Sequence, residues 1–294
     1  MMNSFKATLA GLALIGMATG AQAADVVVGG KNFTEQQLLS SITEQLLEAK
    51  GLTVDNRAGM GSAAVRQAME SGQVDVYWEY TGTSLITYNK VEEKLDADQT
   101  YAKVKELDAG KGIVWLDASK ANNTYAFAMR KSQAEDQGIV TLSDLAAKVN
   151  AGEPLSFGSN AEFYARPDGL KPLQEAYGFE FARAAIKRMD SGLVYQALRD
   201  AQVDVGLVFA TDGRIPAFDF VVLKDNKGYF PAYALAPVIR KEILDAHPEV
   251  GELLNAVSAR LDDAVMAGLN ARVDVDQVSI ENVAADFLKD SGLL

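Results

Sequence analysis

The sequence predicts an α/β protein built from two similar lobes. The chain has 294 residues, and because a single hydrophobic core of that size is unusual, the length indicates two globular units. Short β-rich runs alternate with helical stretches, which is typical of sheets covered by helices. A helix-turn-strand unit also occurs twice, 129 residues apart. Hydrophobic residues make up 48% of the chain, which is enough to fill a large core.

The composition excludes several functional classes. The chain carries 28 Lys and Arg against 40 Asp and Glu, a net charge of −12, so it lacks the clustered Lys and Arg that bind nucleic acids or anionic membranes. It has no cysteine, which excludes disulfides, thiol nucleophiles and thiolate metal sites. The single histidine, His247, excludes a multi-histidine metal centre and is interpreted as a surface residue. We therefore expect no metal and no other cofactor.

Residues 1–23 have the pattern of a secretory signal peptide. Lys6 is followed by a short apolar stretch, and small residues then lead to Ala21-Gln22-Ala23, an A-x-A cleavage site. The alternative is a membrane anchor, but the apolar stretch is shorter than the roughly 20 residues that span a bilayer and contains Gly and Thr. We expect cleavage after Ala23 and a soluble mature protein in the periplasm.

The first part of the mature chain predicts strands and helices in alternation. In order they are a strand at 26–28, a helix at 34–50, a strand at 52–54, a helix at 63–71 and a strand at 74–80. Because helices connect successive strands, this order predicts largely parallel sheets.

The first helix has the clearest pattern. Thr34 and Gln37 have the spacing of a capping box, and Gly51 ends the helix. One face carries an apolar stripe, formed by Leu38, Leu39, Ile42, Leu46 and Leu47. The helix follows Gly29-Gly30-Lys31-Asn32, so its free backbone N–H groups are a candidate anion site. An ordinary strand-to-helix turn is the alternative.

The internal repeat pairs residues 65–80 with residues 194–209. Seven of the 16 aligned positions are identical, and both copies end in an aromatic residue, Tyr80 and Phe209. The favoured interpretation is two lobes of similar construction, each with a ring where its strand ends, which is where ligands bind in open α/β sheets. Chance similarity is the alternative, because helix-turn-strand units share composition.

Two chain crossings between the lobes are expected to form a cleft with a hinge. The candidates are the segment after Asn123-Thr124-Tyr125 and the return at residues 227–231. The first lobe then comprises residues 24–127 and 230–294, and the second comprises residues 128–229. The last part of the chain, from residue 241 onward, has a helical pattern.

Four aromatic residues lie in polar, turn-like contexts, whereas no nucleophile elbow, P-loop, dinucleotide fingerprint or zinc-protease motif is present. They are Tyr80, Tyr125, Phe209 and Tyr233. Rings that converge from two lobes form a box whose negative faces attract a quaternary ammonium group. Four separate packing aromatics are the alternative.

At these residues the sequence resembles the substrate-binding proteins of osmoprotectant ABC importers, which take up glycine betaine, choline and carnitine. Four motifs carry the resemblance in the right order and span nearly all of the mature chain. They are Lys31-Asn32-Phe33-Thr34-Glu35-Gln36, the run Asp75-Val76-Tyr77-Trp78-Glu79-Tyr80-Thr81-Gly82-Thr83, Glu162-Phe163 with Arg166-Pro167-Asp168-Gly169, and Thr211-Asp212-Gly213-Arg214-Ile215.

The resemblance implies the two-lobe type II periplasmic-binding-protein fold with a two-segment hinge. It also implies that Tyr80, Tyr125, Phe209 and Tyr233 form a cage for a trimethylammonium group. By the same match, Lys31, Thr83 and Arg166 correspond to a clamp for the ligand carboxylate. The physical arguments agree, because Lys31 enters the candidate anion site and Arg166 offers a planar fork. Phe209 stands where many relatives carry tyrosine. Trp78 stands where many relatives carry a proline before the motif Glu-Tyr-Thr-Gly-Thr.

The function that this resemblance implies is solute binding for import. We expect a monomeric receptor, not an enzyme, that closes around a small quaternary ammonium osmoprotectant such as glycine betaine and delivers it to an ABC permease and its ATPase. One alternative is a secreted hydrolase that uses carboxylates in the cleft, which turnover would distinguish. The other is a solute-sensing module for a membrane receptor, which differs only in its partner.

Overall fold

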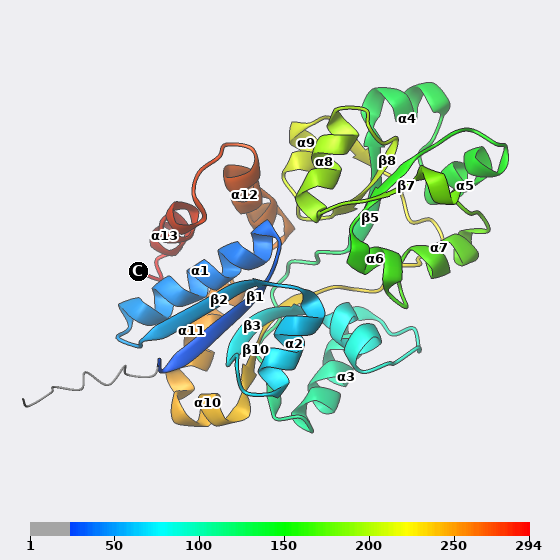
Figure 1. Ribbon diagram of the computed structural model, residues 1–294. Helices are drawn as coiled ribbons and strands as arrows, with labels where there is room; N and C mark the ends of the chain where they lie inside the picture. Colours follow the sequence, from blue (N-terminus) through cyan, green and yellow to red (C-terminus); the bar gives the residue numbers. More distant parts are fainter. Residues whose placement is uncertain (1–23) are drawn as a thin grey trace, which may run out of the picture.

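The computed structural model describes residues 24–294, so the predicted signal peptide and its cleavage site lie outside the described residues. The chain forms two α/β lobes, each built on a five-stranded sheet (Figure 1). Within residues 24–294, no helix combines the length and apolar character that a membrane span requires.

The first sheet has the strand order β2-β1-β3-β10-β4. Its strands are β1 (Val26–Lys31), β2 (Val54–Met60), β3 (Val76–Tyr80), β4 (Ile113–Trp115) and β10 (Leu235–Arg240). β1 runs parallel to β2 and β3, whereas β10 runs antiparallel to β3 and β4.

The second sheet repeats this plan with the order β7-β6-β8-β5-β9. Its strands are β5 (Tyr125–Arg130), β6 (Phe157–Ser159), β7 (Ile186–Arg188), β8 (Val205–Phe209) and β9 (Phe220–Val222). β6 runs parallel to β7 and β8, and β5 runs antiparallel to β8 and β9.

The two-lobe α/β fold is therefore confirmed. The expectation of largely parallel sheets is wrong, because each sheet has as many antiparallel strand pairs as parallel ones. β5 and β10 are the first strands that the chain forms after it crosses from one lobe to the other. Each enters its sheet from the side of the cleft, so it runs against the central strand beside it. The antiparallel pairs thus follow from the two crossings.

Helices cover the sheets and fill the connections. They are α1 (Thr34–Ala49), α2 (Ser62–Glu70), the π-helix η1 (Thr83–Tyr88), α3 (Ala97–Ala109), α4 (Lys131–Gln137), α5 (Leu142–Asn150), α6 (Ala161–Ala165), α7 (Leu170–Tyr177), the short 3-10 turn η2 (Arg183–Ala185), α8 (Ser191–Arg199), α9 (Arg214–Ala217), α10 (Lys241–Ala246), α11 (Pro248–Ser258), α12 (Asp263–Asp274) and α13 (Ile280–Asp290). Figure 1 shows the C-terminal α12 and α13 beside the N-terminal α1, and both helices contact it.

The predicted first helix is confirmed as α1, and its apolar stripe is fully buried. The predicted capping box is wrong. The helix begins after Phe33, which makes no side-chain cap, and the Thr34 hydroxyl instead donates to Oδ1 of Asp274 in α12 at 2.8 Å. Gly51 follows the helix with φ +92°, a conformation that glycine adopts without strain.

The strand predicted at 52–54 lies at β2 instead. β2 carries Asp55, Asn56 and Arg57 at the edge of the sheet. A strand with so many polar residues has no apolar pattern by which the sequence could predict it. The predicted strand at 74–80 corresponds to β3, which begins two residues later.

The internal repeat is structural. A shift of 129 residues converts the bounds of α2 into those of α8 and the bounds of β3 into those of β8. β3 and β8 also occupy the central position of their sheets. The two lobes therefore present equivalent helix-strand units, each ending in an aromatic residue.

The sheets place the first crossing just before Tyr125, where β5 begins. The predicted boundary between residues 127 and 128 thus falls inside β5. The second crossing runs from β9 to β10, and it includes the predicted return segment at 227–231.

Candidate ligand-binding cleft

A cleft of about 1130 Å³ lies between the two lobes. Residues from both sheets and from the first turn of α1 line it. The structure brings together six of the seven predicted site residues on its walls: Lys31, Tyr80, Thr83, Tyr125, Phe209 and Tyr233. The seventh, Arg166, does not line the cleft.

Aromatic rings form a continuous cluster in the cleft. The ring of Tyr125 lies 5.4 Å from that of Phe209 and 5.5 Å from that of Tyr233, measured between centroids. Phe33 stacks on Phe209 at 5.2 Å with an interplanar angle of 11°, and it lies 6.3 Å from Tyr80. The aromatic cluster, defined by these five rings, therefore contains the four predicted rings and Phe33.

Phe33 was missed by the sequence analysis as a site residue. It stands between Asn32 and Thr34, a polar context like those that singled out the other four rings. Its position at the N-cap of α1 places the ring at the end of β1, where it reaches Phe209 of the other lobe. The same criterion applied to this motif would have found it.

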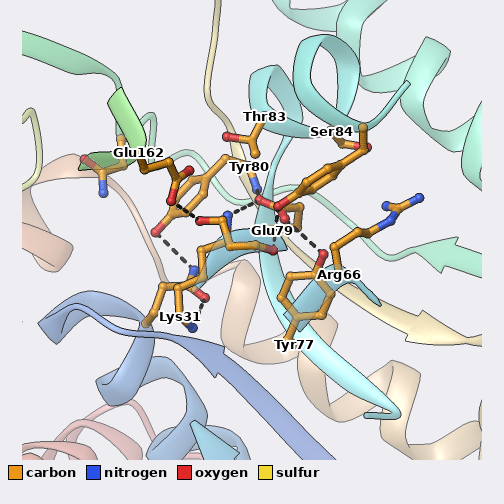
Figure 2. Close-up of polar contacts among 12 residues, drawn as sticks. Lys31, Arg66, Tyr77, Glu79, Tyr80, Thr83, Ser84 and Glu162 are labelled. Carbon is orange, nitrogen blue, oxygen red and sulfur yellow. Dashed lines mark hydrogen bonds and ion pairs between the residues drawn. The ribbon is translucent and has the colours of Figure 1, made fainter. Parts of the chain in front are cut away.

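Lys31 is the last residue of β1 and is almost fully buried. Its Nζ lies 2.5 Å from Oε1 of Glu79, which is itself fully buried. Figure 2 shows Lys31 and Tyr77 both directed at the Glu79 carboxylate, and the Tyr77 hydroxyl donates to it at 2.9 Å. The ammonium group of Lys31 also lies 4.8 Å from the centroid of the Tyr80 ring. Glu79 thus balances the charge of Lys31.

Thr83 is the first residue of the π-helix η1, which follows β3 directly. A buried carboxylate, Asp108, anchors this helix, because it accepts a hydrogen bond from the Ser84 hydroxyl at 2.9 Å. Asp108 also accepts two hydrogen bonds from the guanidinium of Arg66. Although burial opposes it, these bonds hold the pKa of Asp108 well below its usual range.

Arg166 lies behind the wall of the cleft. Its Nε and Nη2 each donate to the Asp168 carboxylate at 2.7 Å, so the two side chains form a bidentate pair. Its Nη1 lies 3.2 Å from Oε1 of Glu162 and 3.4 Å from Oγ1 of Thr83. The Tyr233 hydroxyl also donates to Asp168. Nη1 therefore contacts two residues that line the cleft, whereas the rest of the guanidinium is held by Asp168.

Glu35, in the first turn of α1, lines the cleft with 3% of its surface exposed. It accepts hydrogen bonds from both lobes, namely from the hydroxyls of Tyr80 and Thr211 and from the amides of Asn123 and Asn270. Burial raises the pKa of Glu35, and the four hydrogen bonds oppose that rise. The sequence analysis did not identify this residue as part of the site.

The lobes touch on both sides of the cleft. On one side the Ser62 hydroxyl, at the start of α2, donates to Oε2 of Glu162 in α6 at 2.7 Å. On the other side Nη2 of Arg214 lies 3.2 Å from Oδ2 of Asp274 in α12. Within residues 24–294, no group of three or more His, Cys, Asp and Glu side chains is arranged to hold a metal ion.

Comparison with known proteins assigns this chain to a family. Residues 24–290 match the family described as the substrate binding domain of an ABC-type glycine betaine transport system. The chain is 50% identical to a glycine-betaine-binding protein of Pseudomonas aeruginosa, over 100% of this chain and 96% of the relative. It is 34% identical to the glycine betaine-binding protein YehZ of Escherichia coli, over 92% of each chain.

Solved structures agree with the sequence comparison. The structure of apo YehZ from Escherichia coli superimposes with a TM-score of 0.67, covering 92% of this chain and 100% of that one. A crystal structure of a glycine betaine/carnitine/choline ABC transporter protein, 29% identical, gives a TM-score of 0.73 and covers 91% of this chain and 99% of the other. With its two lobes, its interlobe cleft and these relatives, the chain belongs to the family of substrate-binding domains of ABC-type glycine betaine transport systems.

Proposed function

We propose that this protein is a periplasmic receptor that closes around a quaternary ammonium compound such as glycine betaine and delivers it to an ABC permease. The aromatic cluster carries the proposal. A trimethylammonium group donates no conventional hydrogen bonds, so a site for it uses the negative faces of aromatic rings. Phe33 and Tyr80 from the first lobe and Tyr125 and Phe209 from the second line one cleft, where Phe33 stacks on Phe209 across the lobe boundary.

The ligand carboxylate is proposed to bind at Lys31 and Thr83, with Nη1 of Arg166 behind them. Lys31 and the first residues of α1 line the cleft, and the N-terminus of a helix favours an anion. Nη1 of Arg166 lies within 3.4 Å of the Thr83 hydroxyl, so both donors serve one position on the wall. Since Asp168 occupies the rest of the guanidinium, Arg166 contributes one donor rather than its full fork.

The relatives support the transport role. The family description and the names of the relatives refer to glycine betaine binding and ABC transport. On that basis we propose a permease and its ATPase as partners and a monomer as the binding unit, because one chain supplies both walls of the cleft. The predicted cleavage after Ala23 remains part of this proposal.

Isothermal titration calorimetry with residues 24–294 tests the proposed function. Glycine betaine, carnitine and choline are titrated, with glycine as the matched control that lacks the three methyl groups. We expect saturable one-to-one binding of at least one methylated compound, no binding of glycine, and recovery of the ligand unchanged by NMR. Binding of glycine as tight as that of glycine betaine, or conversion of the ligand, would contradict the proposal.

A further inference from the structure

Glu35 is a buried carboxylate whose charge no side chain of the described residues balances. The other carboxylates that line the cleft differ from it. Glu162 lies within 4 Å of Arg166, and Asp212 and Asp274 each lie within 4 Å of Arg214. Asp190 is exposed to solvent. Among residues 24–294, Glu35 is thus the one buried carboxylate of the cleft wall without a cation within 4 Å.

The neighbours of Glu35 are arranged for its ionised form. Oε1 accepts from the Tyr80 hydroxyl at 2.7 Å and from Nδ2 of Asn123 at 2.8 Å. Oε2 accepts from the Thr211 hydroxyl and from Nδ2 of Asn270 at 3.1 Å. A carboxylate offers about two acceptor sites on each oxygen, so four donors satisfy it completely. A protonated acid would accept at least one fewer of these hydrogen bonds.

The amide orientations in this network follow from other contacts. Nδ2 of Asn270 also donates to the Thr211 carbonyl at 3.0 Å, and Oδ1 of Asn123 accepts from the Thr211 backbone N–H at 3.4 Å. Both amides therefore direct N–H groups at Glu35. Oδ1 of Asn270 is buried and has no hydrogen-bond partner among the described residues. Since Asn270 also lines the cleft, the wall beside Glu35 carries an acceptor that has no donor among the described residues.

We propose that Glu35 is a specificity-determining residue, whose carboxylate balances the positive charge of the bound quaternary ammonium group. The cleft then selects its ligand by charge and not only by the shape of three methyl groups. This inference rests on the proposed function and deepens it. A buried ion without a partner is costly, and a cation that enters the cleft relieves part of that cost.

Tyr80 connects Glu35 to the aromatic cluster. Its hydroxyl donates to the carboxylate, which leaves the phenol ring richer in electrons and its faces more attractive to a cation. Lys31 lies in the same lobe, with its Nζ 4.8 Å from the Tyr80 ring, but its charge is balanced by Glu79. Arg166 is likewise paired with Asp168, so neither cation is free to cancel this effect. The cage and the carboxylate therefore act on the same ligand group.

The experiment compares choline with 3,3-dimethylbutan-1-ol, called dimethylbutanol below. This compound is the neutral isostere of choline, in which a quaternary carbon replaces the nitrogen. Both ligands are measured on the wild type, on Glu35→Gln and on the control Glu48→Gln, which changes an exposed residue of the same helix. The affinity of dimethylbutanol is obtained from its displacement of choline. Circular dichroism melting verifies that each variant is folded.

In Glu35→Gln, we expect choline to weaken at least about tenfold and dimethylbutanol to change by less than about threefold. Glu48→Gln should leave both affinities unchanged. Equal weakening of the two ligands in Glu35→Gln would overturn the inference, because it would show that Glu35 only ties the lobes together. If dimethylbutanol is too weak to measure, a loss of choline affinity below about threefold overturns it.

Tyr80→Phe provides a second variant in case Glu35→Gln does not fold. It keeps the ring and removes the O–H that donates to Glu35. The preference for choline over dimethylbutanol should fall in this variant, and an unchanged preference would contradict the inference. Failure of the proposed function is a different outcome: the wild type would then bind neither choline nor glycine betaine.

Discussion

Tyr80 and Phe209 are equivalent residues of the two lobes, each the last residue of the central strand of its sheet. Phe33 lies between them, 6.3 Å from the first ring and 5.2 Å from the second. The internal repeat therefore ends in the cleft, with one copy contributed by each lobe.

Phe209→Ala should weaken any trimethylammonium ligand by about 1 to 2 kcal/mol, because it removes one ring from the cage. Phe209 is only partly buried, so we expect little change in thermal stability. Phe209→Tyr should keep the affinity or raise it modestly, since it retains the face of the ring. Calorimetry and melting temperature measured on both variants check this.

A different result would assign Phe209 to the core of the second lobe. Truncation of a core phenylalanine costs about 3 to 5 kcal/mol of folding free energy, and an added hydroxyl would be buried without a partner. Melting far below the wild type, with normal affinity in the protein that remains folded, would remove Phe209 from the cage.

Arg166→Ala should weaken glycine betaine by about 2 kcal/mol or more and choline by less, because only the former has a carboxylate. The variant also leaves Asp168 buried without its cation, so the free energy of unfolding should fall by about 3 to 5 kcal/mol. Titrations are therefore run well below the melting temperature. Arg188→Ala, an exposed arginine at the edge of the cleft, is the matched control. Equal losses for the two ligands would show that Arg166 only supports the wall.

Gly213→Ala should push the lobes apart. A Cβ atom at Gly213 would lie 2.5 Å from Cβ of Ala271 and 2.6 Å from the carbonyl oxygen of Ala267, both in α12 of the other lobe. Overpacking of this kind costs about 1 to 3 kcal/mol of folding free energy. Gly268→Ala is the control, because a Cβ there meets nothing within 4 Å and should stabilise α12 by up to about 1 kcal/mol. Similar melting temperatures for the two variants would refute the close contact.

Asp108→Asn should lower the free energy of unfolding at neutral pH by about 3 kcal/mol, because it removes the buried partner of Arg66 and leaves only the partly exposed Glu70. The pKa of Asp108 is depressed in the folded protein, so its stabilisation is present above the unfolded pKa, about 3.9, and is lost as the pH falls below it. Urea unfolding of the wild type and of Asp108→Asn, from neutral pH to below the unfolded pKa, measures the difference in their free energies of unfolding. A difference that grows as the pH falls toward the folded pKa would contradict the assignment.

The sequence predicted those features that local patterns encode. The stripe of α1 and the repeat in α2–β3 and α8–β8 depend on spacing within a few residues, and both are confirmed. The aromatic residues were found because a ring in a polar turn is unusual. The capping box failed because Thr34 bonds to Asp274, 240 positions away, which no local pattern records.

Lys31 and Thr83 were predicted and line the cleft, but the network around Glu35 was missed for the same reason. The partners of Glu35 at Thr211 and Asn270 lie 176 and 235 positions away in the sequence. The pairing of Arg166 with Asp168 is close in sequence, but a family motif shows only which residue is present and not which partner occupies its guanidinium. Tertiary contacts decide both.

In the proposed function the rings of the cage come from both lobes, so ligand affinity and lobe closure form a single equilibrium. The observed Kd equals the intrinsic Kd divided by the fraction of molecules in the closed arrangement. The contacts of Ser62 with Glu162 and of Arg214 with Asp274 join the two lobes at the cleft, so we expect them to contribute to that fraction. Under the proposed function, substitutions at these positions should therefore change how readily the bound compound is released.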